Sequence, residues 1–489
     1  MDGKHRPLAW NVPFDCIARE RRQLPSAGAC IHPGWSRRRS EGVAVSMGDP
    51  GVEAGKARSS RSGPVWALAL LAAALLACGR PAPAAPMATP RAQASFPDYV
   101  RDNPMVHQEG TQLVGPDGAP LRLRGVNLGG WLLWEAWEYG KGGMISETEM
   151  MRRLTELAGA QAAGDFQRGM RANFITEADI RAIARLGFNS VRLPFNAKLL
   201  EEPEAPFAYR AEGWAILDQA LSWCQAHGVY VILDLHAAPG GQSRLTPSDP
   251  SEPEQMLWRS PQAQDRTVAL WKAIAERYRD RTIVAGYDLL NEPLPPRGQA
   301  DQLYALTNRI VTAIRDVDPY HLIVVEGGRF SSDFSMFPGP VSGNQMYGFH
   351  MYTWFGDNRL QAFANLRAVA ESQGVPMWAG EFGENDYEMI TTTVQMYEDP
   401  ANRVTAGWSF WTWKKVPVRN PALVAIDPPE SWNAVIGWIG DPKHNPQPSP
   451  EQARTGMHDF LQAVRFENTS VDPLMLEALS AGWDPTSKP

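Results

Sequence analysis

The sequence predicts a single α/β domain with a (β/α)8 barrel, and three observations support this. From Leu121 onward, apolar runs typical of buried strands alternate with amphipathic segments typical of helices, which is the pattern of a parallel sheet covered by helices. Eight such runs occur, the strand number of a closed barrel. Several runs end in polar or aromatic residues, where barrels of this kind carry their chemistry. The alternative, an open doubly wound sheet, is weakened because no glycine-rich phosphate loop follows the first strand.

The predicted strands are apolar runs, and helices with recognisable start and stop signals lie between most of them. The strands cover residues 121–128, 189–195, 229–236, 284–291, 321–327, 345–352, 376–381 and 404–412. The helices cover residues 176–187, 212–227, 264–279, 299–316 and 359–373. Thr176 and Asp179 form a capping-box pattern, and Gly187, Gly228 and Gly374 give helix stop signals.

Composition indicates an ordinary globular protein. Of 489 residues, 44% are hydrophobic and 21% charged, which is enough apolar material for a large core. The net charge of -7 argues against nucleic acid as a partner, because phosphate binding needs a basic surface. An excess of Trp, 18 residues, either fills the core or provides flat faces on which sugars stack. The spacing of the four Cys residues matches neither a zinc site nor a redox pair.

The first hundred residues contain targeting signals and no predicted folded domain. We expect residues 1–46 to be a disordered or non-native extension, with translation starting at Met47. Residues 47–77 have the basic start, short apolar run and small final residue of a secretory signal peptide. The apolar run is shorter than the roughly 20 residues that span a bilayer. Cys78 follows Leu-Leu-Ala and precedes Gly, which resembles a bacterial lipobox; the alternative is an ordinary cleaved signal.

A segment rich in Pro and Ala follows and predicts a tether. Residues 78–100 begin with the lipidation candidate Cys78 and lack a core of their own, so they would hold the folded domain off a membrane surface. We therefore expect a secreted cell-envelope lipoprotein, at the cell surface or in the periplasm, with a lipid anchor in the membrane. Residues 101–470 form the predicted barrel domain and residues 471–489 a C-terminal tail.

Two glutamates stand where an apolar run meets Pro or Gly. Glu292 follows Leu-Leu-Asn and precedes Pro293, and Glu381 lies in the run Gly-Glu-Phe-Gly. Each could cap a following helix, since acidic residues are favoured there. Two acids at the mouth of one sheet instead indicate paired-carboxylate catalysis. In that chemistry one group acts as acid and the other as nucleophile or base on an acetal such as a glycosidic bond.

Other predicted strand ends carry side chains that fit the same site. A surface ion pair or an isolated polar group explains any one of them. A core-only account does not explain why polar and aromatic groups recur at six strand ends, where a barrel carries its chemistry. The candidates besides the two glutamates are Arg192, His236, Asn291, His350, Tyr352 and Trp411.

In these motifs the chain resembles glycoside hydrolase family 5, a family of retaining β-glycosidases with a (β/α)8 barrel. The resemblance covers about residues 105–465, and Asn-Glu-Pro alone would be weak, but the motifs occur in order. They are Arg124-Gly-Val-Asn-Leu-Gly-Gly-Trp131, Val191-Arg-Leu-Pro, Asp234-Leu-His-Ala-Ala-Pro-Gly-Gly-Gln242, Leu290-Asn-Glu-Pro293, His350-Met-Tyr352, Gly380-Glu-Phe-Gly383 and Trp411.

The resemblance implies a role for each candidate. Glu292 would be the acid/base and Glu381 the nucleophile, with carboxyl groups about 5–5.5 Å apart. Asn291 would bind the sugar 2-hydroxyl. Tyr352 would contact Glu381, and Arg192 would keep that carboxylate ionised by lowering its pKa. No metal or organic cofactor is implied. The residues implied to line the subsite of the cleaved sugar are His236, His350 and Trp411, the last as a stacking platform.

The substrate is predicted only as a class. The stretches 127–131 and 234–242 resemble the branch that contains exo-β-1,3-glucanases and β-glucosidases, which implies a β-glucan or gluco-oligosaccharide as substrate. The loop after Gln242 is polar and contains several prolines, and this departure puts exo action in doubt. The alternatives are the same mechanism on β-mannan or a glucosyl lipid, and a non-catalytic surface protein that binds carbohydrate.

Two segments are expected to be long loops that shape substrate access, namely 131–175 and 414–447. Aromatic residues in and near the predicted loops are candidates for further sugar platforms, although simple packing explains each equally well. They are Trp131, Trp134, Trp137, Trp258, Trp354, Trp413 and Trp438.

Overall fold

The computed structural model describes residues 103–486, apart from 251–255, 354–356, 385, 402–404 and 419. The expected extension (1–46), signal peptide (47–77) and lipidated tether with Cys78 (78–100) all lie outside the described residues. In the described part of the chain, no helix has both the length and the apolar composition needed to span a bilayer.

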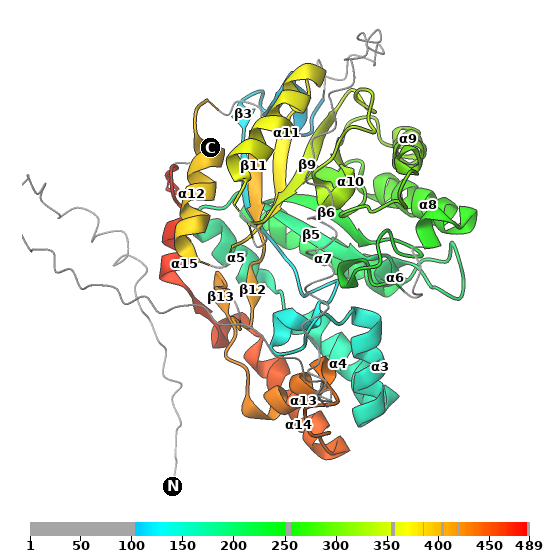
Figure 1. Cartoon of the computed structure of the whole chain (residues 1–489), viewed down its shortest axis with the longest axis vertical. Helices are drawn as coiled ribbons and strands as arrows, with labels where there is room; N and C mark the ends of the chain where they lie inside the picture. The colour runs from blue at the N-terminus through cyan, green and yellow to red at the C-terminus, as the bar shows by residue number, and fades with distance from the viewer. Residues whose placement is uncertain are drawn as a thin grey trace, which may run out of the picture. The chain divides into compact units, whose positions relative to one another are not determined.

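Eight parallel strands close into a barrel, which confirms the predicted fold class and excludes the open sheet (Figure 1). Neighbouring strands pair in chain order, and the last strand, β11, pairs with the first, β4. All residues of β7 and β8 are buried, because helices cover the outside of the sheet and side chains fill the inside. The strands are β4 (Leu123–Asn127), β5 (Ser190–Asn196), β6 (Tyr230–Ala237), β7 (Val284–Asp288), β8 (Leu322–Glu326), β9 (Gln345–Met351), β10 (Met377–Phe382) and β11 (Thr405–Phe410).

The fourth barrel strand, β7, is shorter than predicted. It ends at Asp288 rather than at Asn291. The Asn291 N–H instead bonds to Leu235 O at 3.2 Å, and Glu292 has a φ of 41°, in the left-handed region that few non-glycine residues adopt. The backbone therefore turns at this acid and carries Glu292 beyond the end of the strand.

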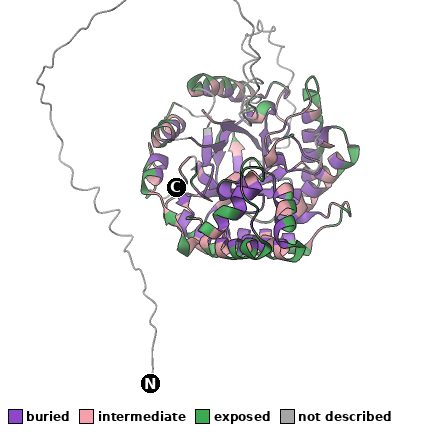
Figure 2. Ribbon diagram, turned by 60° about the horizontal axis from the view of Figure 1, so that its bottom comes forward, coloured by how far each residue is buried: buried purple, intermediate pink, exposed green. Residues whose placement is uncertain are grey.

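Helices surround the barrel. Figure 2 shows buried residues gathered in the central strands and exposed residues on the helices around them. All five predicted helices form, and α12 (Tyr387–Glu398) adds one that was not predicted. The five are α5 (Glu177–Arg185), α7 (Ala211–His227), α8 (Pro261–Tyr278), α9 (Ala300–Arg315) and α11 (Arg359–Gln373).

Most of the predicted helix signals act where expected. Thr176 and Asp179 form the reciprocal capping box at the start of α5. Gly228 and Gly374 end α7 and α11 in the left-handed conformation, which glycine adopts without steric cost. Helix α5 is capped at Leu186, and Gly187 follows it with a φ of 90°, as a helix-ending glycine does.

Of the two expected long loops, the first is largely helical and the second contains one helix and two short strands, so neither is a simple loop. Segment 131–175 contains the 3-10 helix η2 (Ala136–Tyr139), α3 (Glu147–Ala158) and α4 (Ala160–Asn173), and segment 414–447 contains α13 (Glu430–Gly440). With α14 (Pro450–Ala463), helices α3, α4 and α13 pack into one group beside the barrel, here called the helical insert (Figure 1). Its core is aromatic: the rings of Trp432 and Phe460 stack with centroids 4.3 Å apart, which favours close packing of the helices.

The end of the barrel opposite to the strands' carboxyl ends is apolar. A small antiparallel sheet of β1 (His107–Glu109), β2 (Gln112–Val114) and β3 (Pro120–Leu121) precedes the barrel. Its Leu113 and Leu121 belong to the same buried cluster as Leu123, Ile232 and Val324 on barrel strands. This end therefore contributes stability, which leaves chemistry to the other end.

The segment expected to be a C-terminal tail is packed onto the barrel as far as it is described. Helix α15 (Pro473–Leu479) contacts α12, and its Met475 and Leu479 are buried. Beyond it, the Trp483 ring lies 6.1 Å from that of Trp408 on β11. A short sheet of β12 (Lys414–Lys415), β13 (Val424–Ala425) and β14 (Ser470–Val471) joins the same region.

Candidate active site

The structure brings the predicted site residues together at the carboxyl ends of the strands. Successive contacts link them into one network: Trp411 to His236, His236 to Asn291, Asn291 to Arg192, and Arg192 to Glu381. Two further contacts complete it, from Tyr352 to Glu381 and from His350 to Glu292. The site residues therefore come from strands β5, β6, β9 and β10 and from the segments after β7, β9 and β11.

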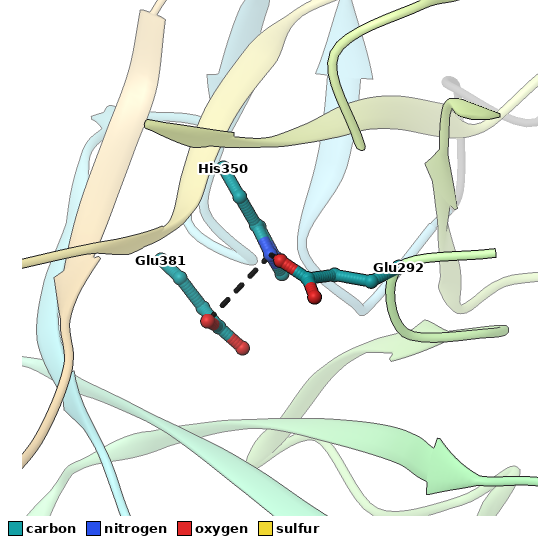
Figure 3. Close-up of side chains that lie close together, drawn as sticks. All are labelled: Glu292, His350 and Glu381. Carbon is teal, nitrogen blue, oxygen red and sulfur yellow. Dashed lines mark hydrogen bonds and ion pairs between the residues drawn. The ribbon is translucent and has the colours of Figure 1, made fainter. Parts of the chain in front are cut away.

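Glu292 and Glu381 face each other across His350 (Figure 3). His350 Nδ1 lies 2.9 Å from Glu292 Oε1 and 3.6 Å from Glu381 Oε2. One oxygen of each glutamate and a histidine nitrogen all lie within 4.8 Å of one another. Paired carboxylates of retaining glycosidases lie about 5–5.5 Å apart and those of inverting enzymes about 6.5–9.5 Å apart, so this arrangement favours the shorter spacing.

The two glutamates differ in their surroundings. The Glu381 side chain is 7% exposed and that of Glu292 18% exposed. Arg192 Nη1 donates to Glu381 Oε1 at 2.6 Å, and the Tyr352 hydroxyl donates to Oε2 at 2.8 Å. Burial by itself would raise the pKa of Glu381, but the positive charges of His350 and Arg192 outweigh it and lower that pKa. Glu381 is thus held as an anion.

The glycine before Glu381 has a steric role. A Cβ at Gly380 would lie 3.2 Å from His350 Nε2 and 3.2 Å from the Trp378 ring, which is tighter than ordinary van der Waals contact. The Gly-Glu-Phe-Gly motif therefore combines a carboxylate with the room that its neighbouring histidine needs.

Arg192, implied to act on Glu381, is fully buried and contacts protein carboxylates, so it does not bind substrate directly. Besides Glu381, its guanidinium lies 3.0 Å from Asp234 Oδ2, 2.9 Å from Asp288 Oδ2 and 2.9 Å from Glu326 Oε1. A guanidinium offers five donors in a fixed fork, which suits this crowded arrangement. Arg192 therefore positions the Glu381 carboxylate from within the protein.

Three of these acids were not among the predicted site residues. Asp234 lies on β6, Asp288 ends β7 and Glu326 ends β8. Each lies at or near the carboxyl end of an apolar strand, and Glu326 is followed by Gly327 and Gly328. That is the same pattern that singled out Glu381, so a search of every predicted strand end would have found it.

His236, Asn291 and Trp411 form one wall of the site. Asn291 Nδ2 donates to His236 Nε2 at 3.2 Å, so the neutral ring carries its proton on Nδ1 and donates to Asp234 Oδ2 at 2.6 Å. Burial lowers the pKa of His236 to about 4, which keeps the ring neutral at ordinary pH. The His236 and Trp411 rings stack with centroids 5.3 Å apart.

Two amides that lie within the quoted motifs, but were not predicted as site residues, fix the backbone around the site. Gln242 Nε2 donates to His236 O at 2.6 Å and to Asn291 O at 2.9 Å. Asn127 Nδ2 donates to Gly380 O at 3.0 Å. Both side chains are fully buried, so each ties one strand end to the next.

The 3-10 helix η2 and the residue before it contribute a second acidic pair near the site, Glu138 and Glu135. Glu135 Oε2 accepts from Trp137 Nε1 at 3.0 Å, and Lys415 Nζ lies 5.0 Å from the centre of the Trp137 ring. Burial raises the pKa of Glu135 to about 7 and that of Glu138 well above its usual range. Burial lowers the pKa of Lys415 to about 8.

Most candidate sugar platforms in the predicted loops are core residues. Trp137 is half-buried, whereas Trp354 lies outside the described residues. Five are buried within the main hydrophobic core, namely Trp131, Trp134, Trp258, Trp413 and Trp438.

The polar loop after Gln242 is anchored to the helical insert. Asp249 accepts from the Thr148 N–H at 2.9 Å and its hydroxyl at 2.8 Å, from Asn196 Nδ2 at 2.8 Å and from Lys198 Nζ at 2.8 Å. These hydrogen bonds hold the described part of the loop, which follows β6, against α3.

Two groups of side chains have metal-ligand spacing. In the first, which contains Glu292 and Glu381, the third ligand would be His350. Burial would lower the pKa of His350, but Glu326 and Glu381 raise it well above its usual range, and a protonated imidazole has no lone pair for a metal. In the second group, Asp234, Asp288 and Glu326 already share the Arg192 guanidinium. Both groups therefore fit internal cations better than a metal.

Comparisons with known proteins agree with this geometry. The model of the cellulase family, glycosyl hydrolase family 5, matches residues 155–416. A "Beta-xylosidase" of Phanerodontia chrysosporium is 32% identical over 354 residues, which is 65% of this chain and 73% of the relative. A "Probable glucan 1,3-beta-glucosidase A" of Aspergillus clavatus is 32% identical over 266 residues, which is 51% of this chain and 60% of the relative.

A bacterial relative and a solved structure extend the comparison. "Endoglucanase C" of Acetivibrio thermocellus is 29% identical over 204 residues, which is 41% of this chain and 57% of the relative. The crystal structure of an endogalactoceramidase shares the fold with a TM-score of 0.50 and 21% identity, and the match covers 72% of this chain and 84% of that one.

Proposed function

The chain belongs to glycosyl hydrolase family 5 and is a glycosidase, and on that premise we propose that it cleaves β-glucans or gluco-oligosaccharides by double displacement with retention of configuration. The observation that carries the retaining mechanism is the arrangement of Glu292, His350 and Glu381, whose reactive atoms lie within 4.8 Å of one another. That spacing leaves no room for a water molecule between a sugar and the second carboxylate, as inversion requires.

In the first step Glu381 attacks the anomeric carbon. The bond between that carbon and the leaving oxygen breaks, Glu292 gives its proton to the oxygen, and an ester forms between the sugar and Glu381. Arg192 and Tyr352, at 2.6 and 2.8 Å from the two oxygens of Glu381, orient the carboxylate and keep it ionised. Asn291 binds the sugar 2-hydroxyl.

In the second step a water molecule attacks the same carbon from the side that the leaving group vacated. Glu292, now a carboxylate, takes a proton from the water while the ester bond to Glu381 breaks. His350 Nδ1 lies 2.9 Å from Glu292 Oε1 and orients this carboxyl group. Trp411, stacked on the neutral His236, forms the floor under the sugar.

The names of the relatives support a β-glucan as the substrate class. Relatives named as a glucan 1,3-beta-glucosidase and as an endoglucanase support a glucan. The relative named as a β-xylosidase makes a β-xyloside the second candidate. The remaining candidates are a β-mannan and a glucosyl lipid.

The test has two parts. Proton NMR of the first product formed from an aryl β-glucoside reports stereochemistry: a β-product is expected, and an α-product would contradict the retaining mechanism. Values of kcat/KM for laminarin, carboxymethyl cellulose, xylo-oligosaccharides, mannan and glucosylceramide report the sugar. The highest value is expected for a β-glucan, and a higher value for any of the last three would overturn the glucan assignment.

We further propose attachment to a membrane of the cell envelope through a lipid on Cys78, after removal of residues 47–77. The support is the sequence alone, in which a basic start and a short apolar run precede Leu-Leu-Ala-Cys. Mass spectrometry of the mature protein tests this: a lipidated Cys78 is the expected first residue, and any other first residue contradicts the proposal.

A further inference from the structure

Glu326, at the end of β8, contacts groups that hold both reactive carboxylates. Its Oε1 accepts from Arg192 Nη2 at 2.9 Å and lies 3.3 Å from His350 Nε2. Its Oε2 accepts from the backbone N–H of Glu292 at 2.6 Å and from the Ser331 hydroxyl. The residue is 3% exposed, so it is reached by protein groups and not by a substrate in the cleft.

The backbone on both sides of this carboxylate is strained. Glu292, whose N–H it accepts, has a φ of 41°. Arg329, Phe330 and Ser331, which follow Gly327 and Gly328 after the strand that ends in Glu326, have φ values of 52°, 58° and 58°. Non-glycine residues stay in the left-handed region only where surrounding contacts hold them, and such residues cluster at functional sites. The hydrogen bonds to Glu326 Oε2 are contacts of this kind.

Glu326 is also the anion among three neighbouring acids. One oxygen each of Asp234, Asp288 and Glu326 lies within 4.8 Å of the others, and three carboxylates this close do not all ionise together. Glu326 receives hydrogen bonds on both oxygens, whereas Asp234 Oδ1 and Asp288 Oδ1 accept none from the described residues. Burial raises the pKa of both aspartates. It would also raise that of Glu326, but the charges of His350 and Arg192 lower it.

We propose that Glu326 is a positioning residue that fixes the acid/base Glu292 relative to the nucleophile Glu381. It does so in two ways: it holds the Glu292 backbone in its left-handed turn, and it pairs with the His350 imidazolium. The opposite side of that ring, Nδ1, lies 2.9 Å from Glu292 and 3.6 Å from Glu381. The inference rests on the proposed function, since it assumes the roles given to the two glutamates.

Glu326→Gln tests the proposal with nearly unchanged side-chain volume. The carboxylate of Glu326 accepts hydrogen bonds from Arg192, Glu292 and Ser331 on its two oxygens. The amide of Gln has only one acceptor oxygen, so at least one of these hydrogen bonds is lost. The acid/base is then misplaced, and we expect kcat on glucosides with poor leaving groups to fall by about 10²-fold. Glucosides with activated aryl leaving groups, which need little protonation, should lose less than about tenfold.

The pH profile gives a readout that a purely structural role would not move. Loss of the Glu326 anion lowers the pKa of His350, because an opposite charge nearby favours the imidazolium. The charged groups facing that ring are Glu292, Glu326 and Glu381, and the other two are unchanged in this variant. The alkaline limb of kcat against pH should therefore move to lower pH.

The matched control is Glu398→Gln. Glu398 has a side chain that is 4% exposed and pairs with Arg122 and Arg124 away from the cleft. Its replacement should leave both the leaving-group dependence and the pH profile as in the wild type. Glu326 would be only structural if its variant lost equal activity on all leaving groups and kept the wild-type pH profile.

Two further variants make each outcome decisive. If circular dichroism shows that Glu326→Gln does not fold, Ser331→Ala is used instead, because it removes one hydrogen-bond donor to Glu326 Oε2. We expect its kcat to fall roughly threefold on glucosides with poor leaving groups and to change little on activated ones. An equal fall on all substrates overturns the proposal. Glu381→Gln is measured alongside. If Glu381→Gln keeps its activity, the proposed function is refuted. If Glu381→Gln is inactive while Glu326→Gln has the wild-type kcat and pH profile, only this inference is refuted.

Discussion

Two buried ion clusters in this molecule have opposite charge ratios. In the first, here called the site cluster, one guanidinium is surrounded by four carboxyl groups at 2.6 to 3.0 Å. In the second, here called the Glu398 cluster, one carboxylate meets two arginines, Arg122 and Arg124, between β4 and α12. Its oxygens also accept from the Trp408 indole at 2.8 Å.

The difference shows what each cluster does. Burial would raise the pKa of Glu398, but the hydrogen bond from Arg124 and the charge of Arg122 lower it, so the group is a stable, fully partnered anion. The site cluster instead contains an excess of acid, aspartate oxygens that no described residue partners, and left-handed backbone at Glu292. Such features cost stability and mark sites where reactivity is maintained. Substitutions in the site cluster should therefore change the catalytic rate, and substitutions in the Glu398 cluster should change the free energy of unfolding.

Glu381→Gln should have the largest effect on rate. The amide cannot attack the anomeric carbon, so we expect kcat to fall by at least about 10⁴-fold on every β-glucoside, including activated ones. The measurement is initial rate on an aryl glucoside, with circular dichroism to show that the variant folds. Activity within tenfold of the wild type would separate this carboxylate from the reaction and break the contrast between the clusters.

Glu292→Gln should have a large effect that depends on the leaving group. General acid catalysis contributes about 10²–10⁴-fold, and it matters most when the leaving oxygen must be protonated. Rates on β-glucan should fall by that amount, whereas formation of the glycosyl-enzyme from a dinitrophenyl glucoside should change little. Comparison of the two substrates checks the assignment, and equal losses on both would contradict it.

Arg192→Lys should show that the site cluster needs a fork of donors and not just a positive charge. A single ammonium cannot contact four carboxyl groups at once, so we expect kcat to fall by about 10²-fold. Arg192 lowers the pKa of Glu381; with weaker contact that pKa rises, and the acid limb of kcat against pH moves to higher pH.

Arg124→Lys is the matched control for this prediction. Arg124 lies on the neighbouring strand β4 but binds Glu398. Its replacement should weaken the fold and leave the acid limb unmoved. A shift of that limb in the control would mean that the two clusters are coupled.

The sequence predicts the barrel and most of the site for the same physical reason. Parallel strands covered on both faces need continuous apolar runs, so a polar residue at the end of such a run is conspicuous. That reasoning identified Glu292 and Glu381 and six partners, which the structure joins in one network. The same pattern marks Glu326, which follows Leu-Ile-Val-Val and precedes Gly-Gly.

Packing that depends on distant segments could not be predicted in this way. Helix α3 had a local signal, since Ser146 and Glu149 have capping-box spacing and Ser146 does accept from the Glu149 N–H. The sequence signal for helix α13 is weaker, because the segment is apolar on most of its surface and shows no clear amphipathic pattern. Its buried Trp432 packs on Phe166 and Phe460 from other helices, and these contacts form only in the folded chain. Nor does strand periodicity reveal the four carboxyl groups around Arg192, since they meet only when the barrel closes.

Glu398→Gln should give the smallest effect, confined to stability. Loss of the charge weakens hydrogen bonds that are worth about 1–3 kcal/mol in total, with kcat and its pH profile unchanged. Because the folded-state pKa of Glu398 is lowered, its contribution is fully present above the unfolded-state pKa near 4.3 and is lost as pH falls through the folded-state pKa. The difference in free energy of unfolding between wild type and variant should therefore be constant near neutral pH and shrink in acid, as urea unfolding at both pH values would show. A difference that grows in acid would mean that the folded-state pKa of Glu398 is raised, as are those of Asp234 and Asp288 in the site cluster.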